Sequence, residues 1–298
     1  MAELLFAPAT DLEAGAKTPV WRRALRHRGF TFGAVVLAFF VIVAIAAPWI
    51  APHDPYAQSL VRRLRPPVWA PNGSWTYVLG TDRFGRDELS RLIYATRSAL
   101  TVAVSSALLA GLIGSVLGVA AGYFRGRVDG VISLVISTRL AFPSLLIALA
   151  VLQVAGSGLW IVILVLGLTL WDRFAVVLRT AVMQISRQDY VLAARAFGSS
   201  HTRIMWKEIV PNVFGHFLVV FSYEAGQAVL AATALSFLGL GIQAPQPTWG
   251  LMMAEGRNWL LTNPWLIANA GIALMFLVLA MNLVGDGLRD VLTPNEKV

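Results

Sequence analysis

The chain has 298 residues, of which 57% are hydrophobic and only 13% are charged, and its mean hydropathy is +0.68. A soluble domain carries about 25% charged residues, so a soluble globular protein, a disordered chain and a coiled coil are excluded. The net charge of +8 comes from basic residues that lie between apolar runs. This placement is typical of a membrane protein with basic flanks and not of a nucleic-acid-binding surface. The absence of cysteine excludes disulfide frameworks and cysteine metal sites.

Charge-poor apolar stretches of about 20 residues are long enough to cross the core of a bilayer as helices. Each such helix satisfies its own backbone hydrogen bonds, as lipid demands. Six stretches of this kind are predicted to span the membrane, at about 30–50, 98–124, 131–154, 159–178, 213–240 and 265–285. The sequence therefore predicts an all-α protein with six transmembrane helices.

Basic residues set the expected orientation of these helices. Several precede the first helix, namely Lys17, Arg22, Arg23, Arg26 and Arg28. No lysine or arginine follows that helix before Arg62. By the positive-inside rule, the N-terminal segment 1–29 and the tail 287–298 should both be cytoplasmic, and residues 51–97 should lie outside. The outer loop is itself rich in arginine, and we resolve this conflict in favour of the first helix.

The outer loop 51–97 is too long for a simple connection. Near its end, residues 85–94 place Leu89, Leu92 and Ile93 at helical spacing. We expect these residues to form an amphipathic helix that lies at the outer surface of the membrane.

The residue types that several chemistries need are missing. A phosphate-binding loop needs a lysine directly after a glycine, and none of Lys17, Lys207 and Lys297 follows one. The four histidines are scattered, and no carboxylate spacing suits a pair of metal ions. We therefore expect that the chain is not an enzyme, that it binds no ATP by this route and that it holds no metal or other cofactor.

The inner loop between the fourth and fifth predicted helices has its own local structure. Helix-forming residues 189–197 are followed by Gly198, which suits the end of a helix, and by serines that can cap the next one. Pro211 is expected to end that second helix. The loop is thus predicted to be a helix–turn–helix, with the small residues Ala193 and Ala194 on its surface.

Two features permit two interpretations each. Nearly bare backbone at Ala193, Ala194 and Gly198 allows another protein to approach closely, but it equally allows tight packing within the chain. Glu224 stands in the middle of the fifth span, where a carboxylate is costly unless it is paired or faces water. It is therefore expected either to line a translocation path or to form a structural pair. A stand-alone ion or solute carrier that uses Glu224 is the alternative function from another class.

The inner loop resembles the EAA loop of ABC-importer permeases, with Gly198, Ile204 and Pro211 at the family spacing. Three further stretches add to the resemblance, namely Leu-Gly-Thr-Asp at 79–82, Leu-Ser-Phe-Leu-Gly-Leu-Gly at 235–241 and Asn-Leu-Val-Gly-Asp-Gly-Leu-Arg-Asp at 282–290. Together they resemble the C-type permease subunits of dipeptide, oligopeptide and nickel ABC importers, over residues 20–295.

The resemblance implies a type I ABC-importer permease fold over residues 98–286, with the EAA loop at 189–212, in a multi-pass protein of a bacterial inner membrane. It implies a B-type permease as partner, two ATPase subunits that bind ATP and Mg²⁺, and a substrate-binding protein on the periplasmic side. The resemblance assigns ATPase coupling to Ala193, Ala194, Arg195, Gly198, Arg203, Ile204 and Pro211. The transported solute stays open among dipeptides, oligopeptides, nickel, opines and sugars.

Overall fold

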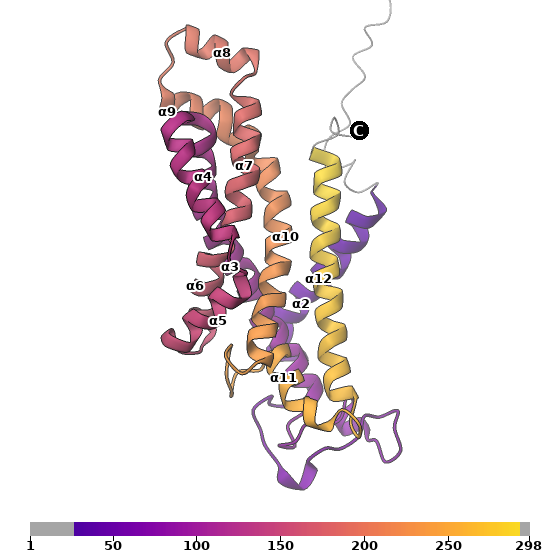
Figure 1. Cartoon of the computed structure of the whole chain (residues 1–298). Helices are drawn as coiled ribbons and strands as arrows, with labels where there is room; N and C mark the ends of the chain where they lie inside the picture. The colour runs from indigo at the N-terminus through magenta and orange to yellow at the C-terminus, as the bar shows by residue number, and fades with distance from the viewer. Residues whose placement is uncertain (1–26, 293–298) are drawn as a thin grey trace, which may run out of the picture.

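A computed structural model describes residues 27–292 of the chain (Figure 1). Within this range the chain is helical apart from its connections, with one isolated β-bridge between Thr81 and Asp87 and no β-strand. The all-α prediction is confirmed. The basic residues Lys17, Arg22, Arg23 and Arg26 and the end of the tail lie outside the described residues.

The helices follow one another along the chain in a simple order. The long ones are α2 (Arg28–Ile50), α3 (Glu88–Phe124), α10 (Val210–Phe237) and α12 (Trp265–Leu292). The intermediate ones are α4 (Gly126–Leu140), α5 (Ser144–Ala155), α6 (Leu159–Thr169) and α7 (Asp172–Ile185). The short ones are α8 (Asp189–Ala196), α9 (His201–Ile204) and α11 (Trp249–Gly256), with 3₁₀ turns at Leu60–Arg62, Trp75–Tyr77 and Arg257–Trp259 and a π-helical turn, η3, at Met205–Ile209.

Five helices of the described chain are long and apolar enough to cross a membrane, counting α6 with α7 as one. The third predicted span is instead a bent pair, because α4 and α5 meet at 81°. Pro143 explains this break, since proline donates no backbone hydrogen bond and disfavours a helical conformation in the residue before it. Five of the six predicted spans thus correspond to candidate spans, and the third corresponds to the bent pair.

The amphipathic helix expected at the outer surface is not a separate element. Residues 88–94 are the first turns of α3, which continues unbroken through the second predicted span. The Asp87 carboxylate caps this helix by accepting a hydrogen bond from the N–H of Ser90 at 3.0 Å. The expectation failed because the polar face of this segment, including Arg91 with 1% exposure, is buried against the outer loop and α11.

Figure 1 places α8 at one end of the molecule, which also holds the start of α2 and the end of α12. We call this the inner end, after the orientation that the basic residues predict. The loop between α2 and α3 lies with α11 at the opposite, outer end. The helices between the two ends pack through small residues as well as large ones.

Close approach of α3 and α7 depends on glycine. Three glycines at intervals of four residues line the side of α3 that faces α7, namely Gly114, Gly118 and Gly122. A β-carbon on any of them would overlap the backbone of α7 or of its first neighbour, Trp171. This is the small-residue contact that lets helices pack within a membrane.

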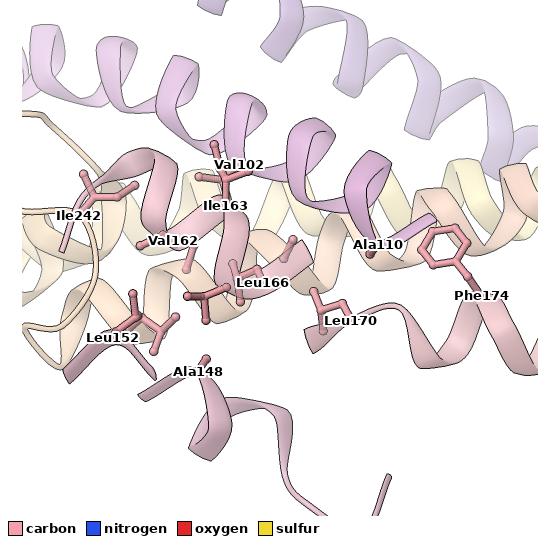
Figure 2. Packing of buried hydrophobic residues seen from close by; sticks show 14 of the residues in the cluster. Val102, Ala110, Ala148, Leu152, Val162, Ile163, Leu166, Leu170, Phe174 and Ile242 are labelled. Carbon is pink, nitrogen blue, oxygen red and sulfur yellow. The ribbon is translucent and has the colours of Figure 1, made fainter. Parts of the chain in front are cut away.

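The largest hydrophobic core surrounds α6 (Figure 2). Val162, Ile163 and Leu166 project from this helix toward side chains of α3, α5 and α7. Phe174 of α7 is fully buried at the edge of the same cluster. Because this core includes the junction of α6 and α7, it fixes the two halves of the fourth span.

Candidate functional site

The loop that joins α7 to α10 forms the tip of the inner end (Figure 1). It is a helix–turn–helix, as predicted, with α8 and α9 as its helices. Gly198 has a φ of +74°, in the left-handed region that favours glycine. Its N–H donates to the carbonyl of Arg195 at 3.0 Å, and the N–H of Ser199 donates to that of Ala194 at 3.1 Å. This pair of bonds is the Schellman ending of a helix, so the glycine is required by the turn.

The second helix of the loop, α9, starts as predicted but does not end as predicted. The Ser200 hydroxyl caps α9 by accepting from the N–H of Arg203 at 3.4 Å, which agrees with the predicted serine cap. Pro211, however, does not end this helix. The chain continues through η3 directly into α10, and Pro211 stands in the first turn of α10. The π-helical turn relaxes the backbone just before a residue that lacks an N–H, which is why the proline is tolerated.

The residues assigned to ATPase coupling divide into two groups. Those on the surface are Ala193, Arg195, Gly198, Arg203 and Pro211, with Ala194 half-buried. Ile204 is only 1% exposed and packs in a cluster with Val191 of α8 and Val213 of α10. Ile204 therefore holds the loop onto the transmembrane helices, whereas the others lie where a partner can reach them.

Phe197 was not selected from the sequence, yet it is the most prominent apolar side chain of the loop. It is 89% exposed and stands at the tip, directly before Gly198. Leu192, on α8, is also exposed. A large apolar residue beside a helix-ending glycine is the sequence signal that could have identified it.

A small polar network ties the loop to the end of α3. The Tyr123 hydroxyl lies 2.8 Å from Nδ1 of His201. The Arg195 guanidinium stacks over the Tyr123 ring, 5.2 Å from its centroid. Nearby, burial raises the pKa of the Tyr190 phenol, and the Glu208 carboxylate raises it further, so this phenol stays neutral. The loop is thus connected to three transmembrane helices, α3, α7 and α10.

Glu224 has a partner within the chain. It is 1% exposed, and its Oε1 lies 3.4 Å from Nε of Arg173 on α7, whose side chain is 54% exposed. Arg173 and Tyr223, but not Glu224, line a cavity of about 590 Å³ between α7, α10 and α12. Glu224 therefore contacts a residue that lines this cavity, Arg173, but does not line it itself.

The outer end holds a second charged group that sequence reasoning missed. Arg86 donates from Nε to Asp82 at 2.6 Å and from Nη2 to Glu255 at 2.7 Å. Arg91 donates from Nη1 to the same two carboxylates, at 2.5 and 2.8 Å. All four side chains are almost completely buried. We call Asp82, Arg86, Arg91 and Glu255 the outer ion network.

No group of histidine, aspartate and glutamate side chains within residues 27–291 is arranged to hold a metal ion. The charged side chains just described neutralise one another instead.

Comparison with known proteins gives consistent matches. Residues 114–298 match the family described as binding-protein-dependent transport system inner membrane component, and residues 19–67 match the N-terminal TM domain of oligopeptide transport permease C. The di/tripeptide transport system permease protein DppC of Pseudomonas aeruginosa is 36% identical over 98% of this chain and 97% of its own. A putative peptide transport system permease protein of Brucella abortus is 36% identical over 100% and 99%. The dipeptide transport system permease protein DppC of Escherichia coli K12 is 38% identical over 93% and 92%.

Proposed function

The chain belongs to the family of binding-protein-dependent transport system inner membrane components, and from this premise we propose its place in an importer. It is a permease subunit of an ABC importer in the inner membrane and is not itself catalytic. This membership favours the permease over the stand-alone carrier that would use Glu224. The solute is a dipeptide or another short peptide, a proposal supported by the names of the similar permeases.

In this proposal the complete importer contains this chain and three kinds of partner. A B-type permease forms the other half of the translocation path, two ATPases bind ATP and Mg²⁺ on the cytoplasmic side, and a substrate-binding protein delivers the solute from the periplasm. The observation that carries the ATPase contact is the exposed tip of the inner end. There Ala193, Phe197 and Gly198 present small and apolar surface on a rigid turn.

Coupling follows from the way the loop is attached. Because α8 is joined to α7 and α9 continues into α10, a displacement of the tip moves both helices. Ile204 and the Tyr123–His201 contact keep the loop from moving separately. ATP binding favours the state in which the ATPases close, and the loop transmits that preference to the translocation path.

The decisive experiment changes the tip and leaves the spans untouched. Gly198→Asp places a charged side chain in open space at the tip, with a strain of roughly 1 kcal/mol from the left-handed backbone. We expect the six spans to insert but the ATPases to bind at least tenfold more weakly, a loss of about 1.4 kcal/mol or more in binding free energy, and therefore to co-purify at reduced yield.

Gly239→Asp is the matched control. Gly239 ends α10 in the same Schellman turn, with a φ of +82° and open space around it, but it lies at the outer end of that helix. The Gly239→Asp substitution should strain the backbone equally and leave ATPase association unchanged. A Gly198→Asp importer that retains its ATPases and hydrolyses ATP normally would remove the proposed coupling contact.

Both termini are proposed to be cytoplasmic, which places the loop of α8 and α9 inside. The cysteine-free chain allows a direct check with an impermeant maleimide on intact cells. Thr202→Cys and Pro71→Cys introduce exposed thiols at the inner and outer ends. Labelling of position 71 and not of position 202 is expected, and the reverse result would invert the topology.

A further inference from the structure

One side chain joins the two breaks that interrupt the third and fourth spans. Arg139, at the end of α4, donates from Nη1 to the carbonyl of Phe142 at 3.3 Å and from Nη2 to the carbonyl of Thr169. The first carbonyl lies at the break between α4 and α5, and the second at the break between α6 and α7. The same guanidinium lies 3.7 Å from Asp172. Arg139 therefore satisfies backbone groups that both breaks release.

A second ion pair continues this contact to α10. Arg173 follows Asp172 in α7, and its Nε lies 3.4 Å from the Glu224 carboxylate. Charges of alternating sign thus run from α4 across α7 to α10. We call Arg139, Asp172, Arg173 and Glu224 the charged belt. Ionisable side chains within membrane-spanning segments usually mark a path for solutes or ions.

Two cavities lie on one face of α10, on either side of the belt. The inner one, of about 590 Å³, is lined from α10 by Val219, Val220 and Tyr223. The outer one, of about 270 Å³, is lined from α10 by Gln227, Leu230, Ala231 and Ala234. These residues recur at intervals of three and four, so they share one side of the helix. The belt therefore stands between two hollow regions of a single continuous surface.

Arg173 and Glu224, which pair between α7 and α10, differ in their freedom to move. Glu224 is 1% exposed, and its Oε1 accepts no hydrogen bond from the described residues. The Arg173 side chain is half exposed, lies over the Tyr223 ring at 4.7 Å and lines the inner cavity. Arg173 can thus turn toward the cavity, whereas Glu224 stays fixed in α10.

We propose that the charged belt is a gate across the translocation path, and that the gate opens when Arg173 exchanges Glu224 for the carboxylate of a zwitterionic solute. The proposal rests on the importer function proposed above. A buried carboxylate that loses the cation paired with it is strongly destabilised. Arg173 therefore leaves Glu224 only when a second cation replaces it, and the ammonium group of the solute is that cation. Arg139 and Asp172 hold the breaks in place during the exchange.

Cysteine accessibility tests the gate in the complete importer, in inverted membrane vesicles without ATP. Val176→Cys reports on the inner cavity and Gln227→Cys on the outer one. An impermeant maleimide added from the inner side should label position 176 quickly and position 227 at least tenfold more slowly. Arg173→Ala should raise labelling at position 227 to within about twofold of position 176.

Arg179→Ala is the matched control, because Arg179 also belongs to α7 and pairs with Asp129 of α4 at 2.8 Å, closer to the inner end. The Arg179→Ala substitution should leave labelling at position 227 slow. The charge exchange Arg173→Glu with Glu224→Arg should restore slow labelling if an ion pair closes the path. Equal labelling of positions 176 and 227 in the parent, or a slow position 227 in Arg173→Ala, would overturn the gate.

Protection by a solute tests the exchange and does not depend on the Arg173→Ala variant. A zwitterionic dipeptide should slow labelling at position 176 at least threefold, whereas the same dipeptide acetylated at its amino end and amidated at its carboxyl end should not. Equal protection by both, or by neither, would overturn the exchange. A failure of the proposed importer function is distinguishable, because it would appear as failure of the ATPases to co-purify while the labelling pattern persists.

Discussion

At the outer end, two arginines and two carboxylates are almost fully buried in the outer ion network, whereas the tip of the inner end exposes Phe197 together with Arg195 and Arg203. Both regions connect membrane-spanning helices, and both contain tight turns. The outer one is enclosed by the chain's own side chains, and the inner one is enclosed on one side only, by Ile204 and its neighbours.

Two glycines make the contrast specific. Gly85 at the outer end and Gly198 at the inner end have nearly the same φ, +72° and +74°. A β-carbon on Gly85 would overlap the carbonyl of Ser59, whereas one on Gly198 would meet nothing within 4 Å. The same backbone conformation is thus packed tightly in one place and left open in the other. The two turns thus differ in packing, because the chain itself surrounds Gly85, whereas the described residues leave Gly198 open, as they also leave Gly239 at the end of α10.

The largest effect is expected from breaking the outer ion network. Arg91→Ala leaves Asp82 and Glu255 with less compensating charge in a buried site, which should lower the free energy of unfolding by about 3–5 kcal/mol. Detergent-titration unfolding of the purified importer would measure it. Arg97→Ala, on the exposed side of the same helix, should change stability by less than about 0.5 kcal/mol. Equal effects of the two variants would mean that the network is not structural.

Alanine at the two glycines compares the ends directly. Gly198→Ala adds only the strain of a left-handed backbone, about 1 kcal/mol. Gly85→Ala adds the same strain and also forces the backbone around Ser59 to move, for a further penalty of about 1–3 kcal/mol. The same unfolding titration measures both. If Gly198→Ala destabilises as much as Gly85→Ala, the inner turn is packed more tightly than the structure indicates.

Prediction from sequence succeeded where the cause is local. Apolar stretches identify the long helices because lipid demands them, and Gly198 with Ser200 defines a turn by its own backbone chemistry. The break at Pro143 is also local, but it lies within a long apolar run, and hydropathy alone predicts a continuous span there. The short helix α11 has too few residues to give a periodic signal.

The outer ion network could not be predicted because its partners are distant in sequence. Arg91 and Glu255 are 164 residues apart, and each resembles an ordinary surface charge when considered alone. The same reason explains the helix at residues 88–94, whose polar face was interpreted as exposed. Ile204 was assigned to a partner contact from its motif position, whereas only the folded chain shows that it is buried.

A smaller effect is expected at the contact between the inner loop and α3. Tyr123→Phe removes the hydroxyl that lies 2.8 Å from His201 and keeps the ring. Stability should fall by about 1 kcal/mol, the usual net value of one hydrogen bond, and ATP hydrolysis should respond less to substrate because the loop is held less firmly. Tyr94→Phe, near the outer end of the same helix, should leave this stimulation unchanged. Normal stimulation in Tyr123→Phe would show that the contact does not serve coupling.

The smallest effect concerns Arg195, which has two candidate roles at the inner end. Its guanidinium lies over the Tyr123 ring at 5.2 Å, and such a contact at an exposed site contributes about 0.5–1 kcal/mol. Arg195→Gln should therefore lower stability by less than about 1 kcal/mol. A double-mutant cycle with Tyr123→Leu should give a coupling energy of about 0.5 kcal/mol, since the two side chains are in contact. If instead the effects are additive in stability while Arg195→Gln alone lowers ATPase co-purification, Arg195 serves the partner and not the turn, and the tip of the inner end is more open than the contact with Tyr123 suggests.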